Sequence, residues 1–179
     1  MNDWNVVITV HERNLAEGLA LLGGFGRISR TEYFNVVVMQ VDNPRFLLEK
    51  LREQALTDPG LHAVLARVVP AAHTFNFQSP EDFEEKAKNV VVQFVPELTG
   101  KKFYVRMHRR GFKGRLSSMQ EEKFLADLLL AALDLTGSPG AIEFDNPDSI
   151  ISIETVGQRA GFSLWSREDL NRYPLLGLD

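Results

Sequence analysis

Apolar positions in the first 73 residues follow two different spacings. Short runs rich in valine and isoleucine predict strands, and leucines three and four residues apart predict helices between them. The expected order is strand, helix, strand, strand, helix, strand, over residues 4–10, 14–22, 25–29, 33–41, 42 onward, and 62–69. A polar three-residue connection between the two middle strands predicts a hairpin.

This β-α-β-β-α-β order is that of a ferredoxin-like sandwich, in which two helices cover one face of an antiparallel sheet. The following segment, 74–80, carries no charge and ends in a helix signature, since Ser79 can cap a helix that begins at Pro80. We therefore predict a domain boundary here, with a ferredoxin-like domain over 1–75 and a second domain over 76–179.

The second half has a different order of elements. A helix over 80–95 carries a single apolar stripe and is expected to end at Pro96. The later elements are a strand over 102–108, a helix opened by a capping box from Ser118 to Glu121, and strands over 141–144, 149–156 and 161–165. The whole chain is therefore predicted to be α+β, with an α/β domain as its second part.

Charge is distributed unevenly along the chain. The 179 residues include 20 Lys and Arg against 24 Asp and Glu, a net charge of −4 that by itself argues against nucleic-acid binding. Segment 101–115, however, contains seven basic residues and no acidic one, whereas the other 164 residues carry a net charge of −11. One cationic segment on an acidic protein favours a single oriented contact with RNA.

Candidate catalytic chemistry is sparse. Cysteine is absent, the four histidines have no metal-binding spacing, and the glycine run at 23–26 lacks both the lysine of a phosphate-binding loop and a full dinucleotide fingerprint. We therefore expect no catalytic residue, no metal, no cofactor and no enzymatic activity. The sequence contains neither an apolar run of membrane-spanning length nor a secretory signal, so we expect a cytoplasmic protein without a membrane partner.

Binding chemistry is concentrated in the basic segment. Lysine and arginine neutralise phosphates, and backbone amides at a helix start add anion contacts. The strand alternation places Arg106 and His108 on one face with Tyr104. Phe112 is either an exposed stacking surface for an unpaired base or a minor core anchor. The candidate RNA-binding residues are Lys101, Lys102, Arg106, His108, Arg109, Arg110, Phe112, Lys113 and Arg115.

Two stretches of the second half resemble the THUMP domain, an RNA-binding module of tRNA-modification proteins. They are 103–111, which ends in His-Arg-Arg-Gly, and 142–154, in which the turn Asp-Asn-Pro-Asp precedes an isoleucine-rich strand. The resemblance covers about 75–179. It implies that the preceding ferredoxin-like domain and the THUMP domain together grip the acceptor end of tRNA and its single-stranded CCA terminus.

The resemblance also implies a partner. THUMP proteins usually carry a catalytic domain, and we expect none after residue 179. The chain is therefore most similar to stand-alone members, tRNA-binding adaptors that present tRNA to a separate RNA cytidine acetyltransferase for N4-acetylcytidine formation. Three alternatives stay open: a THUMP module serving methylation or thiolation, a protein-interaction subunit of another RNA-processing complex, and a small nuclease that uses His108 with Lys113.

Overall fold

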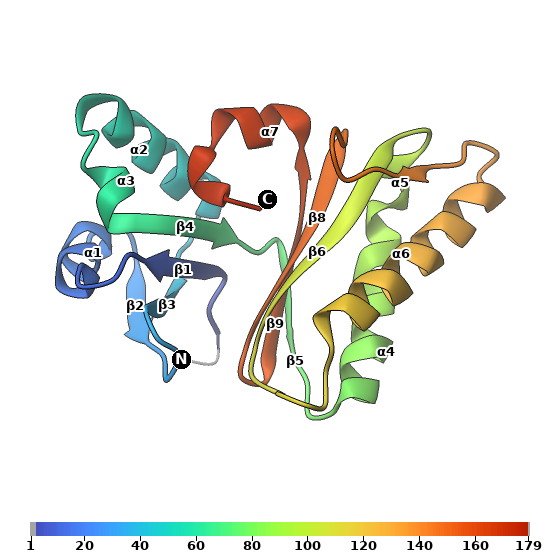
Figure 1. Cartoon of the computed structure of the whole chain (residues 1–179), viewed down its shortest axis with the longest axis horizontal. Helices are drawn as coiled ribbons and strands as arrows, with labels where there is room; N and C mark the ends of the chain where they lie inside the picture. Colours follow the sequence, from blue (N-terminus) through green and yellow to red (C-terminus); the bar gives the residue numbers. More distant parts are fainter. Residues whose placement is uncertain (1–2, 179) are drawn as a thin grey trace. The chain divides into compact units, whose positions relative to one another are not determined.

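The computed structural model describes residues 3–178, and this part of the chain is an α+β protein with two β-sheets (Figure 1). The fold class therefore agrees with the prediction. The described residues form two compact units, one made of 3–72 with 170–177 and the other of 73–169 with Leu178. None of the helices in residues 3–178 combines the length and the apolar character needed to cross a bilayer.

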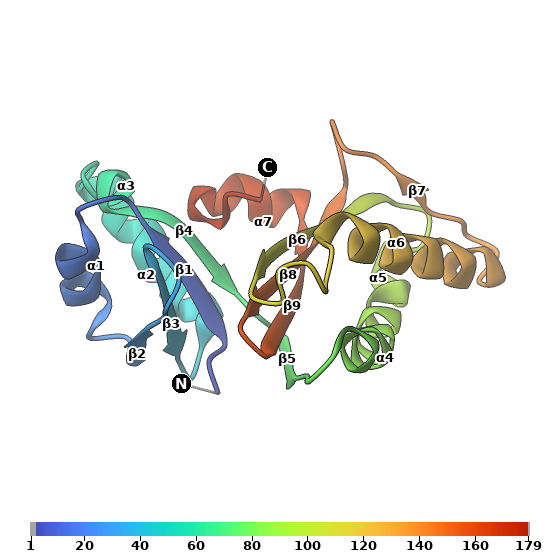
Figure 2. The ribbon, with the colours of Figure 1, turned by 60° about the horizontal axis from the view of Figure 1, so that its bottom comes forward.

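The first unit contains four strands and three helices before residue 73. They are β1 (Val6–Val10), α1 (Leu15–Leu22), β2 (Arg27–Arg30), β3 (Val36–Gln40), α2 (Pro44–Thr57), α3 (Leu61–Val64) and β4 (Leu65–Pro70). The strands pair antiparallel in the order β2-β3-β1-β4, and α1 and α2 lie on one side of the sheet (Figures 1 and 2).

One short helix replaces the start of a predicted strand in this unit. Asp58 accepts the backbone N–H groups of Gly60 and Leu61, and the turn so formed leads directly into α3. Leu61 and Val64, three residues apart on α3, are both buried. The last strand therefore begins at Leu65, because helical spacing rather than alternation buries the apolar residues just before it.

The end of the chain returns to the first unit. It forms α7 (Arg167–Arg172) and the 3-10 helix η2 (Pro174–Leu176), and residues 170–177 pack with the first unit. Arg172 Nε donates to Glu49 of α2 at 2.7 Å, and the Tyr173 hydroxyl donates to the same carboxylate. The hydrogen bonds from Arg172 and Tyr173 lower the pKa of Glu49 to about 2.

The second unit is a five-stranded sheet covered by helices. Its elements are β5 (His73–Asn76), α4 (Pro80–Val91), η1 (Val92–Phe94), α5 (Val95–Leu98), β6 (Lys102–Arg110), α6 (Ser118–Leu135), β7 (Ala141–Ile142), β8 (Ser149–Val156) and β9 (Arg159–Ser166). The strand order is β5-β9-β8-β6-β7, with β6 parallel to both of its neighbours. Helices α4 and α6 lie on the same face of this sheet (Figure 2).

Two details of the second half differ from the prediction. Residues 74–76, at the predicted domain boundary, belong to β5, in which Phe75 stacks on Phe162 of the neighbouring β9 at 5.5 Å. Pro96 does not end the helical segment, which continues as α5 to Leu98. It lies in the first turn of α5, where a residue without an N–H loses no intrahelical hydrogen bond.

Candidate nucleic-acid interface

The basic segment consists of β6 and the loop that connects it to α6. Phe103, Val105 and Met107 are buried in the core beneath the helices. The alternate residues therefore point to the opposite face of the sheet, where the Arg106 guanidinium lies 5.4 Å from the ring centre of Tyr104. The seven lysine and arginine residues of the basic segment are thus divided between the two faces of the sheet and the loop after β6.

On the face opposite the helices, two predicted RNA-binding residues are engaged by a carboxylate. Glu154 of β8 is 2% exposed and is paired with the Arg110 guanidinium. His108 Nδ1 lies 3.3 Å from the other oxygen of Glu154. Arg110 therefore neutralises a buried carboxylate that His108 also contacts, and we infer a structural role for both residues rather than a phosphate contact.

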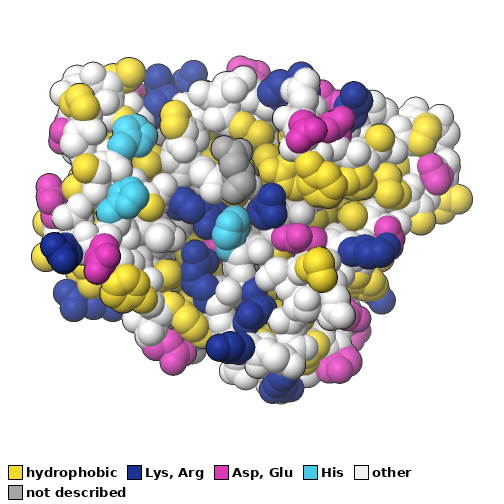
Figure 3. Space-filling model, viewed as in Figure 1, with side chains coloured by type: hydrophobic (Ala, Val, Ile, Leu, Met, Phe, Trp, Pro, Cys, Tyr) yellow, Lys and Arg dark blue, Asp and Glu magenta, His cyan; other side chains and the backbone are white. Residues whose placement is uncertain are grey.

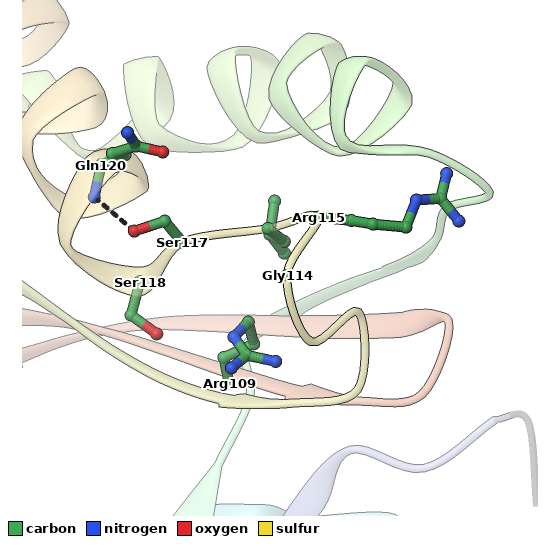
Figure 4. Close-up of a pocket in the computed structure, with 7 residues that line it drawn as sticks. Arg109, Gly114, Arg115, Ser117, Ser118 and Gln120 are labelled. Carbon is green, nitrogen blue, oxygen red and sulfur yellow. Dashed lines mark hydrogen bonds between the residues drawn. The ribbon is translucent and has the colours of Figure 1, made fainter.

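A polar pocket of about 330 Å³ lies where β6 gives way to α6. Its lining residues are Arg109, Gly114, Arg115, Leu116, Ser117, Ser118 and Gln120 (Figure 4). Ser117 caps α6 by accepting the Gln120 N–H, so the N–H groups of the first helical turn are oriented toward this end of the helix. Gly114 has φ +76°, a left-handed backbone conformation that favours glycine and turns the chain into the helix.

Five of the predicted cations, Arg106 among them, have no carboxylate within salt-bridge distance in the described residues 3–178. Lys101, Lys113 and Arg115 are exposed. Arg109 is half-buried, and its guanidinium donates a hydrogen bond to the carbonyl of Gly111. Lys102, by contrast, lies 4.0 Å from Glu143. Lys101 and Lys102 flank the start of β6, about 25 Å along the strand from Arg109, and are therefore distant from the pocket.

Phe112 is part of the hydrophobic packing. Its ring lies 4.9 Å from the ring of Phe77, and the Arg115 guanidinium lies 5.1 Å from its centre. These contacts agree with the core-anchor alternative. Because the residue is only partly buried, the stacking-surface alternative stays a prediction. Arg115 extends away from Arg109 (Figure 4), so the pocket presents one guanidinium at its floor and a second at its margin.

The helix cap lies one residue earlier than predicted. Ser117, not Ser118, is the cap, and Glu121 does not reach back to close a capping box. Its side chain turns inward instead: the residue is 5% exposed, and its Oε2 atom has no hydrogen-bond partner among residues 3–178. Burial, together with the nearby carboxylate of Glu84 on α4, raises the pKa of Glu121 to about 7.

The raised pKa of Glu121 predicts a pH-dependent cost to stability. Because the native pKa is higher than the unfolded one, the free energy of unfolding falls as pH rises from about 4.5 to 7. Glu121→Gln replaces the carboxyl group with an amide that stays neutral at every pH. The variant should therefore raise the free energy of unfolding by about 2 kcal/mol at pH 8 and by almost nothing at pH 4. Urea titrations at the two pH values measure this difference. The exposed Glu85→Gln is the control, and an equal gain from both variants would contradict the assignment.

Comparisons with known proteins find similarity at the level of structure. No family model matches the chain, and no curated protein matches it. Solved structures do match. PH1313 from Pyrococcus horikoshii has 15% sequence identity and a TM-score of 0.57, and the match covers 89% of this chain and 53% of PH1313. TrmN from Thermus thermophilus has 19% sequence identity and a TM-score of 0.57, and the match covers 90% of this chain and 44% of TrmN. A 4-thiouridine synthetase in complex with RNA and ATP has 13% sequence identity and a TM-score of 0.54, and the match covers 91% of this chain and 42% of the synthetase.

These matches establish a THUMP-like fold and correct one expectation. The three proteins contain THUMP domains, and this chain spans about half of their length. TrmN and the 4-thiouridine synthetase are enzymes, which contradicts the expectation of a protein without enzymatic activity. At 13 to 19% identity the likeness concerns the fold, and the activities of these proteins are not transferred to this chain.

Proposed function

We propose that this chain is an RNA-binding module of tRNA modification that holds the acceptor end of tRNA. The pocket between β6 and α6 is the observation that carries the proposal. It places the Arg109 guanidinium beside the first turn of α6, and no carboxylate of the described residues 3–178 lines it. These are the groups that bind phosphate, because the guanidinium is a permanent cation and the helix start carries partial positive charge.

The surrounding charges support an RNA ligand. Arg115 lines the pocket with Arg109, and Lys113 lies between them in the sequence, so three cations fall within seven residues. If these three engage single-stranded phosphates, the logarithm of affinity should fall with the logarithm of salt concentration at a slope of about −2. The solved structure of a similar protein in complex with RNA is compatible with this assignment.

The domains, the partner enzyme and the cellular location that we propose rest on the resemblance to THUMP proteins. A ferredoxin-like domain over 1–75 and a THUMP domain over 76–179 would grip the acceptor stem and the CCA terminus together, in the cytoplasm. The tRNA would be presented to an RNA cytidine acetyltransferase for N4-acetylcytidine formation, with a methylating or thiolating enzyme as the alternative. Acetylation of total tRNA by such an enzyme, measured with and without this protein, distinguishes these alternatives.

Acceptor-end binding is tested by comparing intact tRNA with tRNA trimmed of its CCA terminus. We expect trimming to weaken binding at least tenfold, measured by fluorescence anisotropy at fixed salt. Equal affinity for both RNAs, together with equal affinity for a duplex without unpaired ends, would overturn acceptor-end recognition and leave only attraction to polyanions.

A further inference from the structure

An apolar groove of about 310 Å³ lies on the second unit, along the outer edge of β6. Its walls are Tyr104 and Val105 of β6, Met119 of α6, and Ile142 and Phe144 at and after β7. Met119 and Phe144 are 76% and 66% exposed, so two large apolar side chains face solvent. Figure 3 shows hydrophobic side chains gathered over this part of the second unit, with acidic side chains at their border.

The strand that forms the groove floor has an open edge. β6 runs from Lys102 to Arg110, but β7 pairs with it only at Lys102 and Phe103. Beyond that point the Met107 N–H donates to the Glu122 carboxylate at 2.7 Å, a side chain in the place of a neighbouring strand. Alternate residues of a strand point their N–H and C=O groups to the same edge, so the backbone groups of Val105 face the groove as well.

Charge distinguishes this groove from the RNA pocket. Glu122 and Asp127 line it with Lys123, and Lys123 is already paired with Asp127. Two further acidic residues, at positions 143 and 145, flank the exposed Phe144 in the sequence. Phosphates would therefore meet carboxylates here, whereas lysine or arginine side chains of a partner would be complementary.

We propose that the groove binds an extended segment of a protein partner, added as a strand to the edge of β6. Alternate side chains of such a segment point to the same side, so apolar residues at every second position would fill the groove next to Phe144 and Met119. Lysine or arginine residues beside them would pair with Glu122 and Asp127. The partner's backbone would take the hydrogen bond that Glu122 now makes to Met107.

A random-peptide library displayed on phage tests this assignment with the full 179-residue protein as bait. We expect enriched peptides that alternate apolar and basic residues. The best synthetic peptide should lose at least tenfold in affinity to Phe144→Ser, and none to Phe34→Ser, an equally drastic change at another exposed phenylalanine. A copy of the peptide with N-methylated backbone at alternate positions should also lose at least tenfold, because it can no longer form strand hydrogen bonds.

Several results would overturn the assignment. The first is an absence of enriched peptides, and the second is equal binding of the N-methylated copy. The third is displacement of the peptide by a single-stranded oligoribonucleotide that still binds the Arg109→Glu variant. That third result would make the groove an RNA site. Self-association of the protein alone, abolished by Phe144→Ser in sedimentation measurements, would assign the groove to a second copy. Peptide binding unaffected by tRNA supports the proposal whether or not the RNA pocket is correctly assigned.

Discussion

Replacing Arg110 by leucine is expected to lower the free energy of unfolding by about 3 kcal/mol. The guanidinium of Arg110 is paired with Glu154, and that glutamate is 2% exposed. Removing one partner of a buried ion pair leaves a carboxylate that has lost both its water and its counter-charge. Chemical denaturation followed by circular dichroism measures the loss.

The matched control is Lys113→Leu, which removes an exposed cation three residues further along the chain. Its stability should change by less than about 0.5 kcal/mol. Under conditions in which Arg110→Leu is fully folded, its affinity for tRNA should remain within threefold of the parent. A stable Arg110→Leu that has lost tRNA binding would reverse our assignment and make Arg110 a phosphate contact.

Reversing the charges at Arg109 and Lys113 together, as Arg109→Glu with Lys113→Glu, is expected to weaken tRNA binding about 100-fold at low salt. Each substitution removes a phosphate contact and adds a repelling charge next to the start of α6. The salt slope should become shallower by about 1.4, since single-stranded RNA releases about 0.7 counterion per contact. Anisotropy titrations at several salt concentrations give both quantities.

Arg30→Glu with Lys88→Glu produces the same change in net charge at exposed positions outside the pocket. If RNA is attracted equally to any exposed cation, the two double variants will lose the same affinity. A specific pocket predicts that the control loses less than about threefold. Neither pair of substitutions removes a buried ion pair, so both proteins should fold.

Much of the fold follows from local patterns. Strand β8 is bounded where its isoleucine-rich run predicts, and α4 buries Phe83, Ala87 and Val91 along the predicted stripe. Prediction failed where tertiary contacts override local character. The uncharged segment 74–76 lies at the predicted domain boundary, but Phe75 is a strand residue that stacks on Phe162, which is distant in sequence. The return of 170–177 to the first unit depends on Glu49, which no local pattern indicates.

The candidate site was only partly predictable for a similar reason. The basic segment is visible in the sequence, and so is the start of a helix after it. Which cations are engaged by carboxylates is not visible, because Glu154 lies on a neighbouring strand and pairs in register with His108. The contact of Phe112 with Phe77 is equally invisible to local patterns. Sequence reasoning missed Gln120 and Ser117 as pocket residues, although Ser-Ser-Met-Gln is itself a cap signature.

Hydrogen exchange of the backbone amides, with and without saturating tRNA, tests whether the pocket at the start of α6 binds RNA. We predict that tRNA slows exchange in the segment 113–120, which includes the first turn of α6, and that this protection disappears in Arg109→Glu with Lys113→Glu at equal tRNA concentration. Protection elsewhere on the protein, with unchanged exchange across 113–120 in a complex shown to be saturated, would contradict the assignment of this pocket as the RNA site.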